Sequence, residues 1–179
     1  RGISVLRVGN PTRVNDKMLS FTYERRFEAH ADYPELWKIR KNIRDLLSHV
    51  RKGGRSERDA LKELISKLRI RATELEIRIE DQLFTEARVI ACTLVGAANR
   101  VLERKYFSTL FIDEAAQALE AACWVAILHA GRVVLAGDHC QLPPTIKCVE
   151  AARGGVDRTL IQKVARRKPE VVSMLTLQY

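Results

Sequence analysis

Two adjacent carboxylates, Asp113 and Glu114, interrupt the apolar stretch TLFIDEAAQALEAA at Thr109–Ala122. The residues before them are typical of a buried strand, and an alanine-rich helical run follows. A carboxylate at a strand end can hold Mg²⁺ against nucleotide phosphates, while its neighbour can orient and deprotonate an attacking water. Alternatively, the pair caps the N-terminus of the helix, where negative charge is favoured by about 0.3 to 1 kcal/mol.

A second polar turn, GDHCQLPPT at Gly137–Thr145, follows the strand-like run RVVLA. Asp138 places another acid at a strand end. The amide of Gln141 can donate a hydrogen bond to a terminal phosphate oxygen without adding charge, and the two prolines stiffen the loop. Ligands of open parallel sheets bind beyond the carboxyl ends of the strands, so we expect both turns to border one site. An ordinary tight turn is the alternative for the Pro-Pro segment.

Short apolar runs that alternate with helical segments must position these turns. Their near-continuous apolar character is typical of parallel strands covered on both faces, which predicts an α/β fold with a helix-flanked parallel sheet. The expected strands are Ser4–Val8, Arg88–Leu94, Thr109–Asp113, Arg132–Ala136 and Val171–Leu177, and the expected helices between them are Gln117–His129 and Arg158–Arg167.

A charged helical segment lies between the first two expected strands. Its apolar residues recur at spacings of three and four, and two glycines in RKGGR separate two such runs, which predicts an antiparallel helical hairpin. We favour a solvated face over a nucleic-acid surface for its charges. The expected seam residues are Leu36, Ile39, Ile43, Leu46 and Val50 in the first helix, and Leu61, Ile65, Leu68, Ala72, Leu75 and Ile79 in the second.

The composition is that of a globular domain. The chain has 179 residues, 46% of them hydrophobic, and its 31 basic and 22 acidic residues give a formal charge of +9. Such a surplus favours a polyanionic partner, either a nucleic acid or an anionic membrane surface. No apolar run approaches the roughly 20 residues that span a bilayer. No signal-peptide pattern opens the chain either, so we expect an intracellular protein, cytoplasmic or, in a eukaryote, nuclear. The four cysteines lack zinc-site spacing, and we expect reduced, mostly buried thiols.

Several motifs resemble those of superfamily 1 helicases of the Upf1-like group. DEAAQ at Asp113–Gln117, GDHCQLPPT at Gly137–Thr145 and LQY at Leu177–Tyr179 resemble motifs II and III and the opening of motif IV. LRVGNPTR at Leu6–Arg13 and ACTLVGAA at Ala91–Ala98 are similar to further segments of that group, in the same order. The resemblance implies a partial RecA-like sheet at 1–20 and 87–179, with the helical hairpin inserted at 21–86.

The resemblance also implies roles for individual residues. Asp113 would bind Mg²⁺, Glu114 would be the catalytic base, and Gln141 would contact the γ-phosphate of ATP. Asp138 would couple the nucleotide state to the grip on single-stranded DNA or RNA. Thr93 and Gly96 match the segment that lies along that strand; Arg7 and Arg13 would serve it too, unless they are surface arginines.

Two features that the resemblance would require are absent from these 179 residues. They contain no GxxxxGK[ST] phosphate loop, and the family keeps that loop upstream of residue 1. The second RecA-like domain would follow Tyr179. We therefore expect the chain to need the rest of a helicase, and to be inactive alone.

The sequence leaves two rival functions open. A metal-dependent phosphoesterase would need more His and Asp ligands than the four histidines and the neighbouring acids supply. A non-enzymatic module would instead use the basic helical hairpin to bind nucleic acid or protein.

Overall fold

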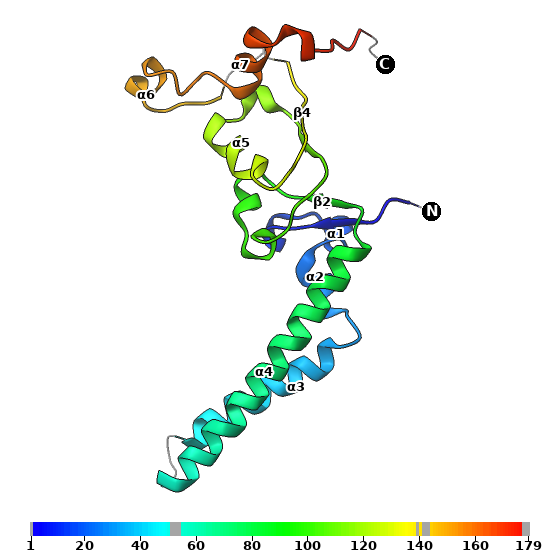
Figure 1. The fold of residues 1–179 in the computed structure, drawn as a ribbon, viewed down its shortest axis with the longest axis vertical. Helices are drawn as coiled ribbons and strands as arrows, with labels where there is room; N and C mark the ends of the chain where they lie inside the picture. The colour runs from blue at the N-terminus through cyan, green and yellow to red at the C-terminus, as the bar shows by residue number, and fades with distance from the viewer. Residues whose placement is uncertain (1, 51–54, 139, 141–143, 177–179) are drawn as a thin grey trace. The chain divides into compact units, whose positions relative to one another are not determined.

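The computed structural model describes residues 2–50, 55–138, 140 and 144–176. The chain divides into two compact units, Arg1–Cys92 (unit 1) and Thr93–Tyr179 (unit 2), which are described separately. Figure 1 shows the chain path of each unit. Gln141 and the LQY segment lie outside the described residues, as does the side chain of Arg13. Among the described residues, no helix is both long enough and apolar enough to cross a membrane.

Unit 1 consists of one parallel strand pair and a helical hairpin. The predicted strands at 4–8 and 88–94 are present in shortened form, with Val5 paired to Val89 and Arg7 to Ala91. The elements are β1 (Val5–Arg7), the 3-10 helix η1 (Pro11–Arg13), α1 (Asp16–Leu19), α2 (Tyr23–Glu28), α3 (Tyr33–Val50), α4 (Arg55–Glu86) and β2 (Val89–Ala91).

Helices α3 and α4 pack side by side as the predicted antiparallel hairpin (Figure 1). The predicted seam is confirmed: every seam residue is buried or half-buried, and Leu75 and Ile79 have no exposed surface. Leu6 of β1 joins the same apolar cluster, so the core of unit 1 extends from the strands into the base of the hairpin.

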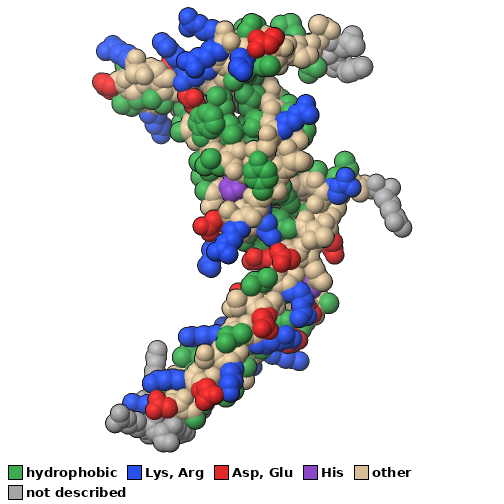
Figure 2. Space-filling model, in the orientation of Figure 1, with side chains coloured by type: hydrophobic (Ala, Val, Ile, Leu, Met, Phe, Trp, Pro, Cys, Tyr) green, Lys and Arg blue, Asp and Glu red, His purple; other side chains and the backbone are tan. Residues whose placement is uncertain are grey.

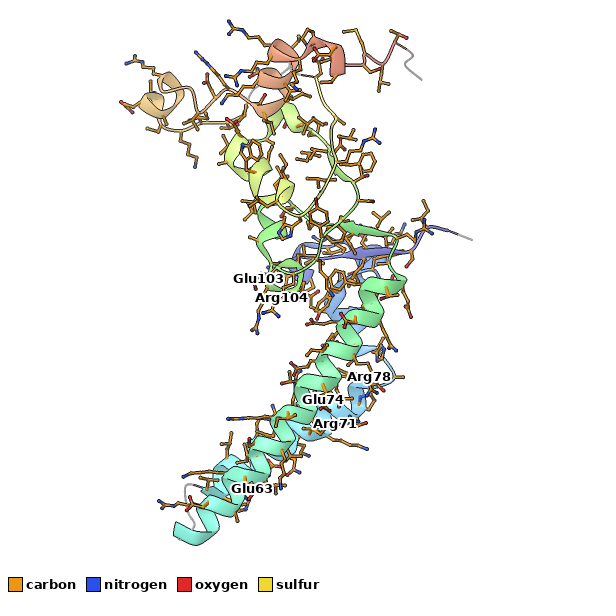
Figure 3. The ribbon with its side chains drawn as sticks, viewed as in Figure 1. Glu63, Arg71, Glu74, Arg78, Glu103 and Arg104 are labelled. Atoms are coloured by element: carbon orange, nitrogen blue, oxygen red, sulfur yellow. The ribbon has the colours of Figure 1, made fainter. Side chains whose placement is uncertain are left out.

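Ion pairs flank this seam. Arg71 Nη2 lies 2.9 Å from Glu35 Oε1, and Arg40 Nη2 lies 2.7 Å from Glu76 Oε1. Arg71 and Arg78 both project from α4, as Figure 3 shows. Positive and negative side chains are interspersed along the hairpin in Figure 2, which agrees with the interpretation of its charges as a solvated, internally paired surface.

Unit 2 contains the second parallel strand pair, with Leu110 paired to Val133 and Ile112 to Leu135. Its apolar cluster centres on Ile112, Ala115 and Cys123. The elements are the 3-10 helices η2 (Val95–Ala98) and η3 (Arg100–Leu102), β3 (Leu110–Ile112), η4 (Ala115–Gln117), α5 (Glu120–Ile127), β4 (Val133–Leu135), α6 (Val149–Arg153), α7 (Leu160–Arg167) and η5 (Pro169–Val171).

The strand predicted at Val171–Leu177 is wrong for the residues that the structure describes. The 3-10 helix η5 ends at Val171, and residues 172–176 have no regular structure. Met174 and Leu175 are 82% and 93% exposed. An apolar run becomes a strand only when a neighbouring strand accepts its backbone hydrogen bonds, and none of the described strands pairs with this one.

The prediction of mostly buried cysteines is also wrong. All four thiols are free, but only Cys123 is buried. Cys92 follows β2, Cys140 lies in the turn after β4, and Cys148 is the N-cap residue of α6. These positions at the ends of elements lie off the apolar faces that bury a cysteine.

Candidate functional site

The turn after β3 carries the acidic pair. Glu114 has a φ of 51° and a ψ of 38°, and it is the one non-glycine residue with a positive φ among the described residues. Its backbone N–H donates to Asp113 Oδ1 at 3.0 Å. Successive side chains of a strand point to opposite faces of the sheet, but the left-handed conformation of Glu114 ends this alternation. Asp113 and Glu114 therefore need not point to opposite faces. Left-handed backbone at a non-glycine residue is unfavourable, and it occurs in turns and clusters at functional sites.

Gln117 contacts the second of these carboxylates. Its Nε2 donates to Glu114 Oε2 at 3.3 Å, and its backbone N–H donates to the Glu114 carbonyl at 2.9 Å. Sequence reasoning assigned Gln117 no role. The spacing of three residues within DEAAQ was the available signal, because residues three apart face each other across one turn of helix.

The turn after β4 lies against the turn after β3. The Ala136 N–H donates to the Ile112 carbonyl at 2.8 Å, and the Ala115 N–H donates to the Ala136 carbonyl at 2.8 Å. Gly137 follows with a φ of 146°, and a Cβ placed on it would lie 3.1 Å from the Ala115 nitrogen. Only glycine permits both that backbone conformation and that close approach. The two turns therefore meet backbone to backbone.

Asp138 stands next to this contact. Its Oδ1 accepts a hydrogen bond from the Cys140 backbone N–H at 2.9 Å, which fixes the start of the loop. The structure thus brings Asp113, Glu114 and Asp138 to adjacent turns at one edge of the β3–β4 pair.

The residues predicted to contact single-stranded nucleic acid lie in two places. Thr93 Oγ1 accepts a hydrogen bond from the Gly96 backbone N–H at 3.0 Å, so these two residues form one small turn at η2 in unit 2. Arg7 belongs to unit 1, where its half-buried side chain makes a long hydrogen bond of 3.5 Å from Nη1 to the Asn10 carbonyl. Arg13 lies in η1 of the same unit.

The ligand set at the β3 turn is sparse. Asp113 and Glu114 are both exposed, and no group of three or more His, Cys, Asp or Glu side chains gathers in the described part of the chain. One or two carboxylates match the way proteins bind Mg²⁺, whose remaining ligands are water and substrate phosphates. They do not match a closed zinc site, which needs four protein ligands.

Most of the chain is similar to known proteins. Residues 1–148 match the family described as AAA domain. The DNA-binding protein SMUBP-2 of Mus musculus is 33% identical over 181 residues, which cover 98% of this chain and 18% of that relative. An uncharacterized ATP-dependent helicase of Methanocaldococcus jannaschii is 26% identical over 212 residues, 99% of this chain and 32% of the relative.

A third relative is similar over a shorter span at higher identity. The regulator of nonsense transcripts 1 homolog of Drosophila melanogaster is 40% identical over 108 residues, 60% of this chain and 9% of the relative. The chain spans less than a third of the length of each of these relatives. It belongs to the AAA domain family and to the Upf1-like group of superfamily 1 helicases.

Proposed function

We propose that this chain is part of an ATP-driven helicase or translocase that moves 5′ to 3′ on single-stranded DNA or RNA. Residues 1–20 and 87–179 would form part of its first RecA-like domain, and 21–86 would be an insertion. The rest of the helicase chain would supply the phosphate loop and a second RecA-like domain, so the 179 residues alone would not hydrolyse ATP. We expect the protein in the cytoplasm or, in a eukaryote, the nucleus.

The observation that carries this proposal is the backbone contact between the two strand-end turns. The Ala115–Ala136 hydrogen bond of 2.8 Å and the close approach of Gly137 hold the Asp113–Glu114 turn against the turn that begins with Asp138. Turns at the carboxyl ends of parallel strands are where α/β sheets bind nucleotides. The sparse, hard-oxygen ligand set at this edge supports a magnesium nucleotide over a multi-metal centre.

Each acidic side chain would then have a separate task. Asp113 would hold the Mg²⁺, which supplies charge compensation for the phosphates when it is bound. Glu114 would take a proton from the attacking water, while the Gln117 amide holds its Oε2 atom. Gln141 would contact the γ-phosphate, and Asp138 would transmit its presence to the nucleic-acid side of the protein.

Thr93 would contact the nucleic-acid strand through its hydroxyl group. Its oxygen accepts the Gly96 N–H, and the hydroxyl proton remains available to donate to a phosphate oxygen. Gly96 would then act by shaping this turn, since its N–H is engaged. Arg7 and Arg13 would contribute positive charge from unit 1, which makes salt-sensitive and sequence-independent contacts with phosphates.

Substitution of Glu114 in the complete parent helicase tests the proposal. Glu114→Gln keeps the size and the hydrogen bond to Gln117 but removes the base. We expect nucleic-acid-stimulated ATP turnover to fall by about 10² to 10⁴-fold, with ATP and strand binding retained. The matched control is Glu103→Gln, which alters an exposed carboxylate outside the two turns (Figure 3).

Three outcomes would count against specific parts of the proposal. Undiminished turnover in Glu114→Gln would remove the base assignment. Nucleic-acid-stimulated turnover by the purified 179-residue chain would contradict the expected inactivity of this piece. Unwinding of duplexes with a 3′ tail and not of those with a 5′ tail would reverse the proposed polarity.

A further inference from the structure

A cavity of about 260 Å³ lies at the base of the hairpin in unit 1, where α2, α3 and α4 meet. Three aromatic side chains line it: Tyr23 and Phe27 from α2, and Tyr33 from the start of α3. The Phe27 and Tyr33 rings meet edge to face with centroids 6.0 Å apart, and the Tyr23 and Phe27 centroids are 5.6 Å apart. The rings therefore form a continuous wall.

The rest of the lining is strongly acidic. Glu24, Glu28, Glu76 and Glu80 contribute four carboxylates, and Arg40 contributes one guanidinium. This excess of negative charge stands out in a chain whose formal charge is +9. Negative charge beside half-buried aromatic rings is the combination that binds an organic cation.

Three of the four carboxylates are already engaged by the protein, and the most weakly held is Glu28, whose Oε2 lies 3.7 Å from Arg25 Nη1. Glu76 Oε1 pairs with Arg40 Nη2 at 2.7 Å, and Glu80 Oε1 accepts a hydrogen bond from the Tyr23 hydroxyl at 2.8 Å. Because Tyr23 is a neutral donor, Glu80 keeps its charge without a counterion from this contact.

Glu24 has unused acceptor capacity. Its Oε2 is shielded from solvent and has no hydrogen-bond donor in the structure, so Glu24 acts on the cavity through its charge. Arg26 has a similarly unpartnered Nη1, but it does not line the cavity. The negative field also acts on Tyr23: burial, then the hydrogen bond to Glu80 and the charges of Glu80, Glu24 and Glu76, raise the pKa of its hydroxyl.

We propose that this cavity is a binding site for a compact organic cation, a guanidinium or ammonium group on a short aliphatic stem. The volume limits the occupant, because sites for drug-sized ligands enclose about 300 to 1,000 Å³ and this one is smaller. A nucleotide is excluded by charge as well as by size. The head of an arginine or lysine side chain fits both the volume and the field, whether it comes from a polypeptide or from a free amine.

Aromatic NMR signals of the 179-residue chain provide the test. The probe is arginine blocked at both ends by acetyl and methylamide groups, and the control probe is blocked citrulline, which has nearly the same shape without the charge. We expect blocked arginine to shift the Tyr23, Phe27 and Tyr33 ring signals in a saturable way, and blocked citrulline to leave them unchanged.

Matched variants separate the site from general electrostatics. Glu24→Gln should weaken binding about tenfold, because it removes one negative charge from the lining of the cavity. Phe27→Leu should weaken it through loss of a ring face. Glu63→Gln changes an exposed carboxylate that pairs with Lys67 farther along α4, and should leave binding unchanged.

The source of the cation is resolved by comparing probes. A short arginine-containing peptide that binds more tightly than blocked arginine would identify a polypeptide partner. Spermidine that binds as tightly as this peptide would identify a free amine. Equal shifts with citrulline, no saturation, or unchanged affinity in Glu24→Gln would overturn the proposal. If Glu24→Gln unfolds unit 1, the exposed Glu28→Gln replaces it, with a smaller expected loss and the same criterion.

Discussion

Strands β1 and β4 each end two residues before a glycine with a φ of 146°, but the two glycines have different surroundings. A Cβ on Gly9 would meet only the end of the Arg7 side chain, at 3.9 Å. A Cβ on Gly137 would meet the backbone nitrogens of Ala115 and Ala116, at 3.1 and 3.2 Å. The same positive φ thus occurs at an open position in unit 1 and at a backbone-to-backbone contact in unit 2.

The contrast extends to how each turn is held. After β1, the Asn10 side chain accepts hydrogen bonds from the Thr12 N–H at 2.9 Å and the Thr12 hydroxyl at 2.8 Å. After β4, the main contact joins Ala136 to the turn that carries Glu114. One main-chain bond to the neighbouring strand anchors each turn, from the Val8 N–H to the Ala91 carbonyl and from the Ala136 N–H to the Ile112 carbonyl. The further bond from the Ala115 N–H to the Ala136 carbonyl ties the acidic pair to the turn of Asp138.

The apolar clusters of the two units differ in the size of their buried side chains. Leu6, Leu36 and Leu75 belong to one cluster of long side chains in unit 1, whereas Ala115 and Cys123 contribute small side chains to the cluster of unit 2. Unit 1 is therefore packed along a seam of long side chains, whereas in unit 2 larger side chains such as Leu110 and Leu160 pack around small buried residues. Each unit has one tryptophan, Trp37 or Trp124, both about half exposed, so unfolding can be followed separately.

The largest effect is expected at the seam of the hairpin. Leu75 has no exposed surface, so Leu75→Ala leaves a cavity and should lower the free energy of unfolding of unit 1 by about 2 to 5 kcal/mol. Urea unfolding followed by Trp37 in a Trp124→Phe background measures this, and Leu64→Ala at a 44% exposed position of α4 is the control. An equal loss in both variants would mean that the seam does not dominate.

The glycine comparison gives the next largest effect. Gly137→Ala places a side chain at a positive φ and against backbone, so it should destabilise unit 2 by about 1 to 3 kcal/mol. Gly9→Ala has the same backbone cost without the steric contact and should destabilise unit 1 less. Trp124 and Trp37 fluorescence report the two transitions. Equal losses would show that the φ angle, and not the contact with the β3 turn, sets the requirement for glycine.

Local patterns in the sequence predicted unit 1 well. The spacing of apolar residues identified the two faces of the hairpin because neighbours three and four apart share a face in any helix. The parallel strand pairs were also predicted in outline, but each strand is shorter than its apolar run. Strand ends are set by the partner's hydrogen bonds, and those depend on residues as distant in sequence as Val5 and Val89.

Sequence patterns named residues of the candidate site but not their conformation. The acidic pair and Asp138 were identified from their positions after apolar runs, and the structure brings their turns together. The left-handed backbone of Glu114 and the close approach of Gly137 could not be predicted, because both arise from contacts between separate segments. The same dependence explains the failed strand at 171–177, which no described strand completes.

A smaller effect is expected at the N-terminus of α7, where side chains accept hydrogen bonds from the backbone N–H groups. The fully buried Thr159 forms a capping box with Gln162, in which each side chain accepts the other's backbone N–H, at 3.4 and 3.0 Å. Thr159→Ala should lower the free energy of unfolding of unit 2 by about 1 kcal/mol. Trp124 fluorescence in a Trp37→Phe background measures it. Thr159→Ser keeps the hydroxyl and should recover most of the loss; failure to recover would assign the effect to packing.

The smallest expected effect is a pH dependence that distinguishes the link between α5 and α7 from the rest of unit 2. The hydrogen bond from Lys163, with smaller contributions from Trp124 and from the charges of Lys163 and Arg167, holds the pKa of Glu120 below its usual range. A carboxyl whose pKa is lower in the folded state stabilises fully above its unfolded pKa. This contribution is lost as the pH falls through the folded value.

Unit 2 should therefore lose about 0.2 to 1 kcal/mol through Glu120 between neutral pH and strongly acidic solution, the amount typical of a partly exposed pair. Glu120→Gln should remove this share and flatten the curve of Trp124-monitored stability against pH. High salt should reduce the difference between the two proteins at neutral pH, because it screens the pair. Parallel curves would mean that the pKa of Glu120 is the same in the folded and unfolded chain. The link between α5 and α7 would then depend on the apolar contacts of Leu160 and Ile161.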